Sequence, residues 1–345
     1  MRAMVLRRLG PLAELPDPLE PLEPPQPLPG PQELQVRVSV CGVCHTELDE
    51  IEGRTPPPRL PVIPGHQVVG RVERLGEGVT GFARGDRVGI AWIHSACGHC
   101  RFCRSGRENL CPAFVATGRD VNGGYAEYAT VPAAFAHPLP ATLDDAGVAP
   151  LLCAGAIGYR SLRLSGHGDG DALGLSGFGA SGHLVLQMVR RRFPRSRVHV
   201  FARSERQRSF ALELGAAWAG AIGDPAPEPL QAVIDTTPAW RPDVAALGNL
   251  APGGRLVINA IRKEEADKAA LLALDYPRDL WMEKEIRSVA NVTRRDVREF
   301  LALAADLGLR AELREFPLAE ANRALRELQG GHGRGACVLR IGADG

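Results

Sequence analysis

Residues 172–192 read ALGLSGFGASGHLVLQMVRRR, and this stretch is the clearest indication of the fold. The apolar run ALGL predicts a short buried strand, GFGASG follows the pattern G-x-G-x-x-G, and the residues after it have helical periodicity. In such a strand–turn–helix unit, the first glycine permits the tight turn. The second lets the backbone approach a pyrophosphate at the helix N-terminus, and the third allows close helix–sheet packing. A plain glycine-rich turn is the alternative, but the flanking strand and helix favour dinucleotide binding.

The segments after this stretch continue the alternation of strands and helices. Short apolar runs predict strands at 197–201 (RVHVF), 232–235 (AVID) and 255–259 (RLVIN), and ERQRSFALELG at 205–215 predicts a helix that Gly215 closes. Strands that alternate with helices indicate a parallel sheet covered on both faces. We therefore expect an α/β fold with a doubly wound parallel sheet of the Rossmann type.

The segments before this stretch have a different character. Apolar and polar residues alternate in ELQVRVSV at 33–40, and further β-rich runs with glycine between them occur at 68–79, 85–92 and 123–131. A chain of 345 residues is long enough for two domains. The N-terminal part, up to about residue 150, is expected to form a mainly β domain.

Composition and charge exclude some classes of function. The chain carries 41 basic and 40 acidic residues, a net charge of +1, so we expect neither nucleic acid nor an anionic membrane as a partner. The sequence contains no apolar run of about 18 residues, which a membrane span would require. MRAMVLRRLG also lacks the apolar core of a signal peptide. We therefore expect a cytoplasmic protein, whose eight cysteines are metal ligands or free thiols rather than disulfides.

The clearest metal signal is a cluster of four cysteines with the spacing C-x2-C-x2-C-x7-C. They are Cys97, Cys100, Cys103 and Cys111. Four thiolates so close together can surround one tetrahedral Zn2+ and leave no open position, which predicts a structural zinc site. The alternatives are an iron–sulfur cluster, for which C-x2-C-x2-C is also typical, and unpaired thiols.

A second group is dispersed along the chain. Cys44 lies in Cys41-Gly-Val-Cys44-His45, a pattern shared by c-type haem attachment sites, redox pairs and zinc knuckles. His66 and Cys153 are far from it in the sequence. Each alone is a weak signal, because a single cysteine is most often a small buried residue. The residues by themselves leave the role of this group open.

Taken together, these motifs give the chain a resemblance to the zinc-dependent alcohol dehydrogenases of the medium-chain dehydrogenase/reductase family. The resemblance covers roughly residues 30–340 and rests, in order, on CGVCHTEL, PGHQVVG, GDRVGIAW, CGHCRFCRSGRENLC, NGGYAEYATV, PLLCAGAIGY and GFGASG. It implies a zinc-binding, GroES-like catalytic domain at 1–153 and 291–345, and a Rossmann domain at 154–290. It also implies a homodimer or homotetramer.

The resemblance assigns roles to individual residues. It implies a catalytic zinc bound by Cys44, His66 and Cys153, in addition to the structural zinc of the four cysteines, and therefore two Zn2+ per chain. Thr46 matches the hydroxyl that relays the proton of the bound alcohol. His45 matches a position that faces the coenzyme or assists this relay.

Three positions depart from the family pattern. Glu47 replaces the usual aspartate that holds the zinc-bound histidine by its second nitrogen, and it can do the same with one extra methylene. Gln67 replaces the usual glutamate behind the metal, which removes a negative charge. Asp49 takes the place of the histidine that often ends the proton relay, and its carboxylate can accept the proton.

The resemblance also implies which residues bind the coenzyme and which line the substrate pocket. The coenzyme loop comprises Gly177, Phe178, Gly179, Ala180, Ser181 and Gly182. Trp92 matches an aromatic residue that lines the substrate pocket. NAD-binding folds usually place an acidic residue after the second strand to bind the ribose 2′-hydroxyl. That place holds Ala202 here, followed by Arg203 and Ser204, two hydrogen-bond donors suited to a phosphate, which slightly favours NADP over NAD.

We therefore expect a zinc- and NAD(P)-dependent alcohol dehydrogenase, which transfers a hydride reversibly between a zinc-bound primary or secondary alcohol and the coenzyme. Two alternatives stay open: a reductase of aldehydes or activated carbonyl compounds, and a zinc- and dinucleotide-binding protein without turnover. A protein without turnover has no need of an open zinc site. The second alternative is therefore disfavoured by the presence of Cys44, His66, Cys153 and Thr46.

Overall fold

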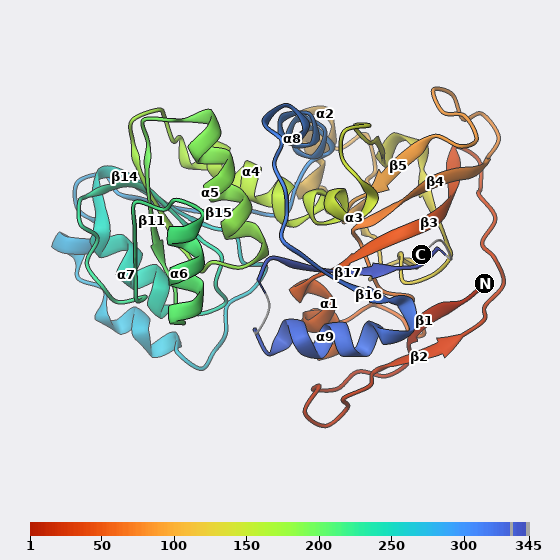
Figure 1. The fold of residues 1–345 in the computed structure, drawn as a ribbon, viewed down its shortest axis with the longest axis horizontal. Coiled ribbons are helices and arrows are strands. Elements are labelled where there is room, and N and C mark those ends of the chain that lie inside the picture. Colours follow the sequence, from red (N-terminus) through yellow and green to blue (C-terminus); the bar gives the residue numbers. More distant parts are fainter. Residues whose placement is uncertain (332–333, 343–345) are drawn as a thin grey trace. The chain divides into compact units, whose positions relative to one another are not determined.

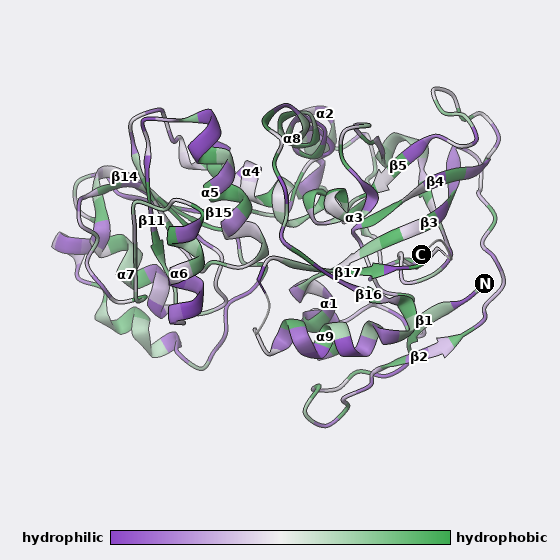
Figure 2. Cartoon of the chain, in the orientation of Figure 1, coloured by the Kyte–Doolittle hydropathy of each residue, from purple (hydrophilic) through white to green (hydrophobic). Residues whose placement is uncertain are grey.

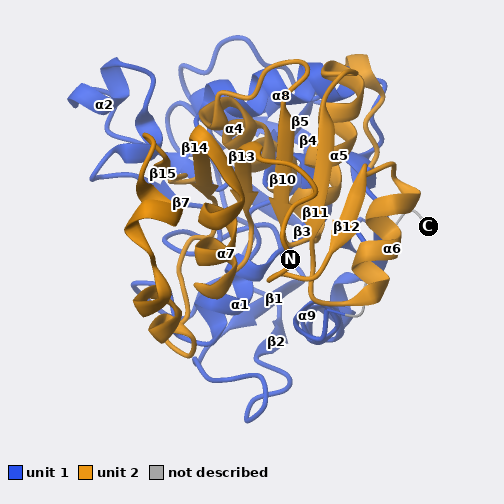
Figure 3. Cartoon of the chain, turned by 90° about the vertical axis from the view of Figure 1, so that its left-hand side faces the viewer, with its two compact units in different colours: residues 1–153, 292–305, 311–345 blue, residues 154–291, 306–310 orange. Residues whose placement is uncertain are grey.

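The computed structural model describes residues 1–331 and 334–342. The chain divides into two compact units, which Figure 3 colours separately. Unit 1 comprises Met1–Cys153, Val292–Ala305 and the described residues of 311–345, and unit 2 comprises Ala154–Asn291 and Asp306–Arg310. Unit 1 is therefore built from sequence on both sides of unit 2.

Unit 2 is built around a six-stranded parallel sheet. From one edge to the other, its strands are β12 (Trp218–Gly220), β11 (Arg197–Phe201), β10 (Ala172–Ser176), β13 (Leu230–Asp235), β14 (Leu250–Ile258) and β15 (Glu285–Ser288). The strand order reverses between β10 and β13, which makes the carboxyl ends of these two strands the switch point of a doubly wound sheet. This topology confirms the Rossmann fold that the sequence predicts.

Helices cover this sheet, as Figure 1 shows. They are α4 (Ala154–Ser165), α5 (Ala180–Arg192), α6 (Glu205–Glu213) and α7 (Arg241–Asn249), followed by the short η4 (Lys268–Ala273) and η5 (Tyr276–Leu280). Right-handed connections place α5 and α6 on one face and α7 on the other. Leu173, Leu175 and Ile234 are fully buried, because both faces of the central strands are covered.

Unit 1 holds a seven-stranded, mainly antiparallel sheet. Its strands are, in order, β16 (Leu313–Pro317), β17 (Ala336–Arg340), β3 (Glu33–Val43), β4 (Val68–Leu75), β5 (Arg87–Ile90) and β9 (Ala136–Pro138), with β8 (Tyr128–Pro132) also paired to β3. Two smaller sheets pair β1 (Ala3–Leu6) with β2 (Leu19–Leu22), and β6 (Ile93–Ser95) with β7 (Val115–Ala116). The alternation in ELQVRVSV buries Leu34, Val36 and Val38 in the core.

Helices of 3 to 14 residues lie between these strands. They are α1 (His45–Ile51), α2 (Arg101–Arg104), η1 (Glu108–Leu110), η2 (Ala133–Phe135), α3 (Asp145–Val148), η3 (Ala149–Leu152), α8 (Arg294–Leu307), η6 (Leu318–Glu320) and α9 (Ala321–Gln329). Figure 2 shows hydrophobic residues gathered on the strands and hydrophilic ones along helices such as α6 and α9. No helix in the described part of the chain combines the length and the hydropathy that a membrane-spanning segment requires.

The strand predicted over 123–131 is wrong in its first half, since β8 begins only at Tyr128. The two glycines of this run lie very close to other segments. A Cβ atom on Gly123 would stand 2.1 Å from the carbonyl oxygen of Gly65, and one on Gly124 would stand 3.0 Å from Sγ of Cys41. The glycines therefore form a loop that packs tightly over Cys41 instead of a strand.

Candidate active site

The first candidate site lies where strand β3 ends. Cys41 is inside the strand and fully buried in the core of unit 1, whereas Cys44 follows the strand and occupies the cap position of α1. It is Cys44 that lies near other metal-ligating side chains. The two cysteines of the C-x-x-C pattern therefore have different surroundings and do not form one site.

Cys44, His66 and Cys153 are brought together by three separate elements. Cys44 begins α1, His66 precedes β4, and Cys153 directly follows η3. The two sulfurs and a ring nitrogen of His66 all lie within 4.8 Å of one another. Two thiols and one imidazole at this separation match the three-ligand set of a catalytic zinc site, which keeps one position open.

Glu47 holds two of these three residues in place. Its Oε1 lies 2.6 Å from Nδ1 of His66, and its Oε2 accepts a hydrogen bond of 2.8 Å from the amide of Cys44. Nε2 of His66 is buried and has no hydrogen-bond partner among the described residues. The arrangement therefore fits a metal ion at Nε2, with Glu47 supporting the ring from its other side.

The groups of this site shift one another's pKa values. The pKa of Cys44 lies well below its usual value, because the Cys153 thiol donates a hydrogen bond to it and His66 adds to the effect. The same hydrogen bond, together with burial, raises the pKa of Cys153. Burial alone would lower the pKa of His66, but the Glu47 carboxylate and Cys44 raise it well above the usual range. Metal binding must therefore displace protons from this site.

Thr46 and His45 lie in the first turn of α1. Oγ1 of Thr46 is 3.6 Å from Sγ of Cys44, so its hydroxyl stands beside the candidate ligands. His45 is exposed on the surface of unit 1. The structure therefore places Thr46 close to the ligand set and His45 next to it at the surface.

Asp49 and Gln67 are two of the departures from the family pattern. Asp49 accepts a hydrogen bond of 2.6 Å from Nε of Arg54, so a cation neutralises the carboxylate that was expected to end the proton relay. Gln67 is buried and packs against β3: a Cβ atom on Gly42 would stand 2.7 Å from its Oε1.

The four-cysteine lobe is the second place where thiols converge. The sulfurs of Cys97, Cys100, Cys103 and Cys111 lie within 4.8 Å of one another. The amides of Cys100 and Cys103 donate to the sulfurs of Cys97 and Cys100, at 3.4 and 3.5 Å. The Cys100 amide is the main reason why the pKa of Cys97 falls to about 6. Four sulfurs without an open position fit a structural zinc ion.

A buried carboxylate fastens this lobe to the rest of unit 1. Glu108 lies between Cys103 and Cys111 and is 3% exposed. Its Oε1 accepts hydrogen bonds from the amide (2.8 Å) and from Nε (3.2 Å) of Arg294, the first residue of α8. Sequence analysis missed this contact, because Arg294 belongs to no motif and lies far away in the chain.

Trp92, the predicted wall of the substrate pocket, follows β5 and is almost fully buried. Its ring packs against Phe114, with the ring centroids 5.1 Å apart. Within residues 1–331 and 334–342, its buried Nε1 has no hydrogen-bond acceptor. Phe114 was not singled out from the sequence, although its place just after Cys111 was a usable signal.

In unit 2, the glycine loop has the geometry that a dinucleotide requires. Gly177 has a φ of +83°, and a Cβ atom there would stand 2.5 Å from Oγ1 of Thr236. A Cβ atom on Gly179 would instead meet no described atom within 4 Å. No described side chain caps the N-terminus of α5, which begins just after Gly179. The open space and the free amides fit a bound pyrophosphate.

The residues after β11 are the ones that distinguish NAD from NADP in this fold. Ala202 follows the strand directly, and the next residue, Arg203, is exposed. Oγ of Ser204 accepts a hydrogen bond of 3.2 Å from the amide of Gln207, so it caps α6. Nη1 of Arg208 donates to the carbonyl oxygens of Ala202 and Arg203, both at 3.0 Å, and thereby fixes the backbone that carries the Arg203 side chain.

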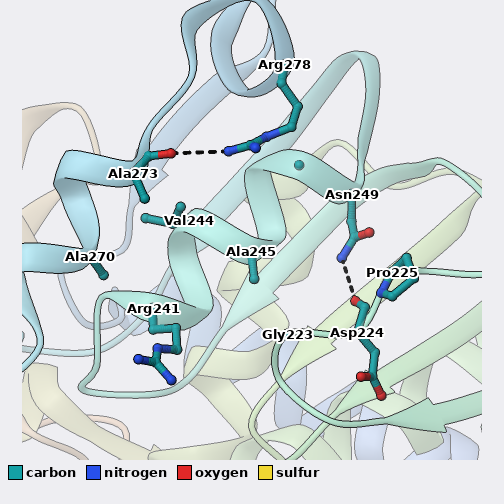
Figure 4. Close-up of a pocket in the computed structure, with 11 residues that line it drawn as sticks. Gly223, Asp224, Pro225, Arg241, Val244, Ala245, Asn249, Ala270, Ala273 and Arg278 are labelled. Atoms are coloured by element: carbon teal, nitrogen blue, oxygen red, sulfur yellow. Dashed lines mark hydrogen bonds between the residues drawn. The ribbon is translucent and has the colours of Figure 1, made fainter.

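A pocket of about 480 Å³ lies elsewhere in unit 2, along α7 (Figure 4). Arg241 and Arg278 are among its lining residues, and Nη2 of Arg278 donates to the carbonyl of Ala273 at 3.2 Å. Asn249 donates to the carbonyl of Asp224 at 3.3 Å. The lining contains none of the site residues predicted from the sequence, all of which the structure describes, so this pocket is not the candidate active site.

Comparison with known sequences identifies relatives of the whole chain. Residues 30–141 match the family described as alcohol dehydrogenase GroES-like domain. The chain is 45% identical over 346 residues to a probable alcohol dehydrogenase, AdhA, of Mycobacterium tuberculosis, which covers 99% of this chain and 97% of that protein. It is 33% identical to an alcohol dehydrogenase of Geobacillus stearothermophilus, over 90% of this chain and 92% of that protein.

Solved structures share the fold over the same extent. A thermostable alcohol dehydrogenase from Pyrobaculum aerophilum, with cobalt and zinc bound, matches with a TM-score of 0.87 and 27% identity over 99% of both chains. A cinnamyl alcohol dehydrogenase from Sorghum bicolor matches with a TM-score of 0.86 and 27% identity, over 100% of this chain and 98% of that one.

Proposed function

The chain belongs to the zinc-type medium-chain alcohol dehydrogenases, and from this premise we propose that it oxidises a primary or secondary alcohol reversibly with NAD(P) as the coenzyme. The observation that carries the proposal is the convergence of Cys44, His66 and Cys153, with Glu47 bound to the second nitrogen of His66. Three ligands leave a position for a substrate, whereas the four-cysteine lobe does not.

We assign the following roles to the residues of the zinc sites. Cys44, His66 and Cys153 would hold the catalytic zinc, and the four-cysteine lobe would hold a structural zinc. When bound, the catalytic zinc would act as a Lewis acid, which lowers the pKa of the substrate hydroxyl or polarises a carbonyl group. Glu47 occupies Nδ1 of His66 and thereby leaves Nε2 for the metal.

Thr46 is the residue that we assign to proton transfer. Its Oγ1 stands 3.6 Å from Sγ of Cys44, so it can reach the hydroxyl of an alcohol held beside this sulfur. It can accept the proton of that hydroxyl while it passes its own to solvent, and the exposed His45 beside it offers a path. The alcohol carbon gives its hydride to the coenzyme, so oxidation removes one proton and one hydride in total.

For the coenzyme, we propose a preference for NADP. Ala202 presents no carboxylate to repel a 2′-phosphate, and Arg203 presents a cation at the next position. Arg208 supports this assignment, because it anchors the backbone of both residues. A guanidinium held in this way is suited to a phosphate.

For the assembly, we propose a homodimer or homotetramer that forms through the edge of the unit 2 sheet. Strand β15 is one of the two edge strands of this sheet, and all of its residues are exposed. Trp281, Met282 and Ile286 are 55%, 52% and 53% exposed and lie in or beside this strand. An exposed strand edge with large apolar side chains is suited to pairing with a second copy of the chain.

Zinc analysis combined with steady-state rates tests the proposed reaction. We expect the wild-type chain to contain two zinc ions and to oxidise alcohols, and Cys153→Ala to contain one and to lose this activity. Cys337→Ala, which removes a buried thiol outside both cysteine groups, is the matched control and should keep both zinc ions. Full alcohol oxidation by Cys153→Ala would refute the assignment. Rates with alcohols and aldehydes of rising size then define the preferred substrate and direction.

A further inference from the structure

Lys263 is a buried cation in unit 2. Its side chain is 8% exposed, and four oxygen atoms lie within 3.0 Å of Nζ. They are Oδ2 of Asp235 (2.6 Å), Oδ2 of Asp243 (2.7 Å), and the carbonyl oxygens of Ala239 (2.9 Å) and Thr237 (3.0 Å). An ammonium group has three hydrogens, and the hydrogen bonds to Asp235, Thr237 and Ala239 employ all of them, while Asp243 adds an ion pair.

The partners of Lys263 belong to segments that leave the central strands. Asp235 is the last residue of β13, Thr237 and Ala239 lie between β13 and α7, and Lys263 itself follows β14. In a doubly wound sheet, the coenzyme binds in the crevice at the carboxyl ends of these strands. Lys263 therefore ties the exits of β13 and β14 together beside that crevice.

Thr236 connects this cluster to the glycine loop. It follows Asp235, and its amide and its Oγ1 both donate to the carbonyl oxygen of Ser176, at 2.9 and 3.0 Å. Ser176 precedes Gly177, whose Cβ, if it had one, would stand 2.5 Å from Oγ1 of Thr236. A shift of the β13 exit would therefore move the turn that has to receive the pyrophosphate.

The charges of the cluster make Lys263 difficult to replace. Two carboxylates, a fully buried Asp235 and a 4% exposed Asp243, face this one ammonium group. Burial and the neighbouring Asp235 raise the pKa of Asp243 to about 7, against the opposing effect of Lys263. Loss of the cation would leave two buried carboxyl groups without a counter-charge, so one of them would have to take up a proton or move away from the other. We expect the loop to move in response.

We propose that Lys263 is a positioning residue for coenzyme binding, which holds the exits of β13 and β14 against Ser176 and Gly177 so that the crevice is formed before the coenzyme arrives. The inference rests on the proposed function, because it concerns the affinity for the coenzyme of that reaction. Lys263 itself takes no part in hydride or proton transfer.

Equilibrium binding of NADPH and NADH to the zinc-loaded chain, followed by fluorescence, tests this inference. We expect Lys263→Met to raise the Kd and the KM for the coenzyme about tenfold, and Lys263→Arg, which keeps the charge but not the geometry, about threefold. The kcat at saturating coenzyme and the zinc content should stay near the wild-type values. Lys268→Met is the matched control, because Lys268 is 56% exposed and pairs with the exposed Glu265.

The outcomes separate the inference from a purely structural role. An unchanged coenzyme Kd in Lys263→Met would overturn it, even if the melting temperature falls. If Lys263→Met does not fold, the coenzyme Kd of Lys263→Arg is measured instead, and an unchanged Kd in that variant overturns the inference. A wild-type chain that binds neither coenzyme would overturn the proposed function, and the inference with it.

Discussion

Glu47 and His66 form a buried carboxylate–imidazole pair, in which Oε1 lies 2.6 Å from Nδ1. The other carboxylate oxygen accepts a hydrogen bond from the amide of Cys44, so one side chain supports two residues of the candidate ligand set. The pair determines which nitrogen of His66 is left for a metal ion. A glutamate can thus take the role of the aspartate in the family pattern.

The first prediction concerns this pair. Glu47→Gln is expected to weaken zinc binding at Cys44, His66 and Cys153 about 10- to 100-fold, because the ligand histidine loses the carboxylate that orients it. Competition with a chromophoric chelator measures the affinity. Glu47→Asp keeps the charge and should lose less. Equal zinc affinity in Glu47→Gln and the wild type would show that the pair does not tune the site.

The second prediction concerns the attachment of the four-cysteine lobe. Glu108→Gln removes a buried charge that accepts two hydrogen bonds from Arg294, so the free energy of unfolding should fall by about 2 kcal/mol. Urea unfolding of the zinc-loaded chain measures this difference. Arg295→Gln is the control, since the 69% exposed Arg295 side chain pairs with Glu299 at the surface and should change the value by no more than about 0.5 kcal/mol. Equal effects of both variants would contradict a special role for Glu108.

Those parts of the molecule that rest on local patterns could be predicted from the sequence. The strand, glycine turn and helix of residues 172–192 are contiguous, so periodicity and glycine spacing sufficed for the Rossmann unit. Cys44, His66 and Cys153 were each uninformative alone. The family resemblance, which rests on the motifs around them, implied that they form a group, and the structure brings the three residues together.

Contacts between distant residues could not be predicted in this way. Neither the type nor the spacing of Glu108 and Arg294 indicates a partner, because only the fold brings the two together. The wrong strand at 123–131 has a related cause. The run is rich in β-forming residues, but the close approach of Gly123 to Gly65 is a tertiary contact that no local pattern reveals.

The third prediction concerns pH. Burial, with a contribution from Arg298 and Arg294, lowers the pKa of His137 to about 4, whereas an unfolded histidine titrates near about 6.5. Between these values the unfolded chain binds the additional proton, so stability falls as the pH falls. The loss from this group should reach about 2 kcal/mol between pH 7 and pH 5. Urea unfolding at several pH values measures the free energy of unfolding as a function of pH. For His137→Gln this free energy should change less steeply with pH than for the wild type, and an identical dependence would exclude this assignment.

The fourth prediction separates two glycines of the coenzyme loop. Gly179→Ala puts a methyl group into the open space where a pyrophosphate is expected, so it should abolish coenzyme binding while the melting temperature stays unchanged. Gly177→Ala should instead destabilise the fold, because the φ of residue 177 is +83° and the new Cβ atom would clash with Oγ1 of Thr236. Thermal melting with and without NADPH distinguishes the two effects. Tight coenzyme binding by Gly179→Ala would show that the loop does not hold the pyrophosphate.

The last prediction concerns the choice of coenzyme. Arg203→Gln should lower the preference for NADPH over NADH about tenfold or more, because a charged hydrogen bond to a phosphate contributes about 1.5–3 kcal/mol and each 1.4 kcal/mol is about a factor of ten. The KM for NADH should change little, since NADH has no 2′-phosphate. Arg206→Gln, an exposed position on the following helix, is the matched control. The ratio of the two KM values, measured at one carbonyl substrate concentration, gives the preference. If Arg203→Gln leaves this ratio unchanged, the proposed NADP preference has lost its structural basis.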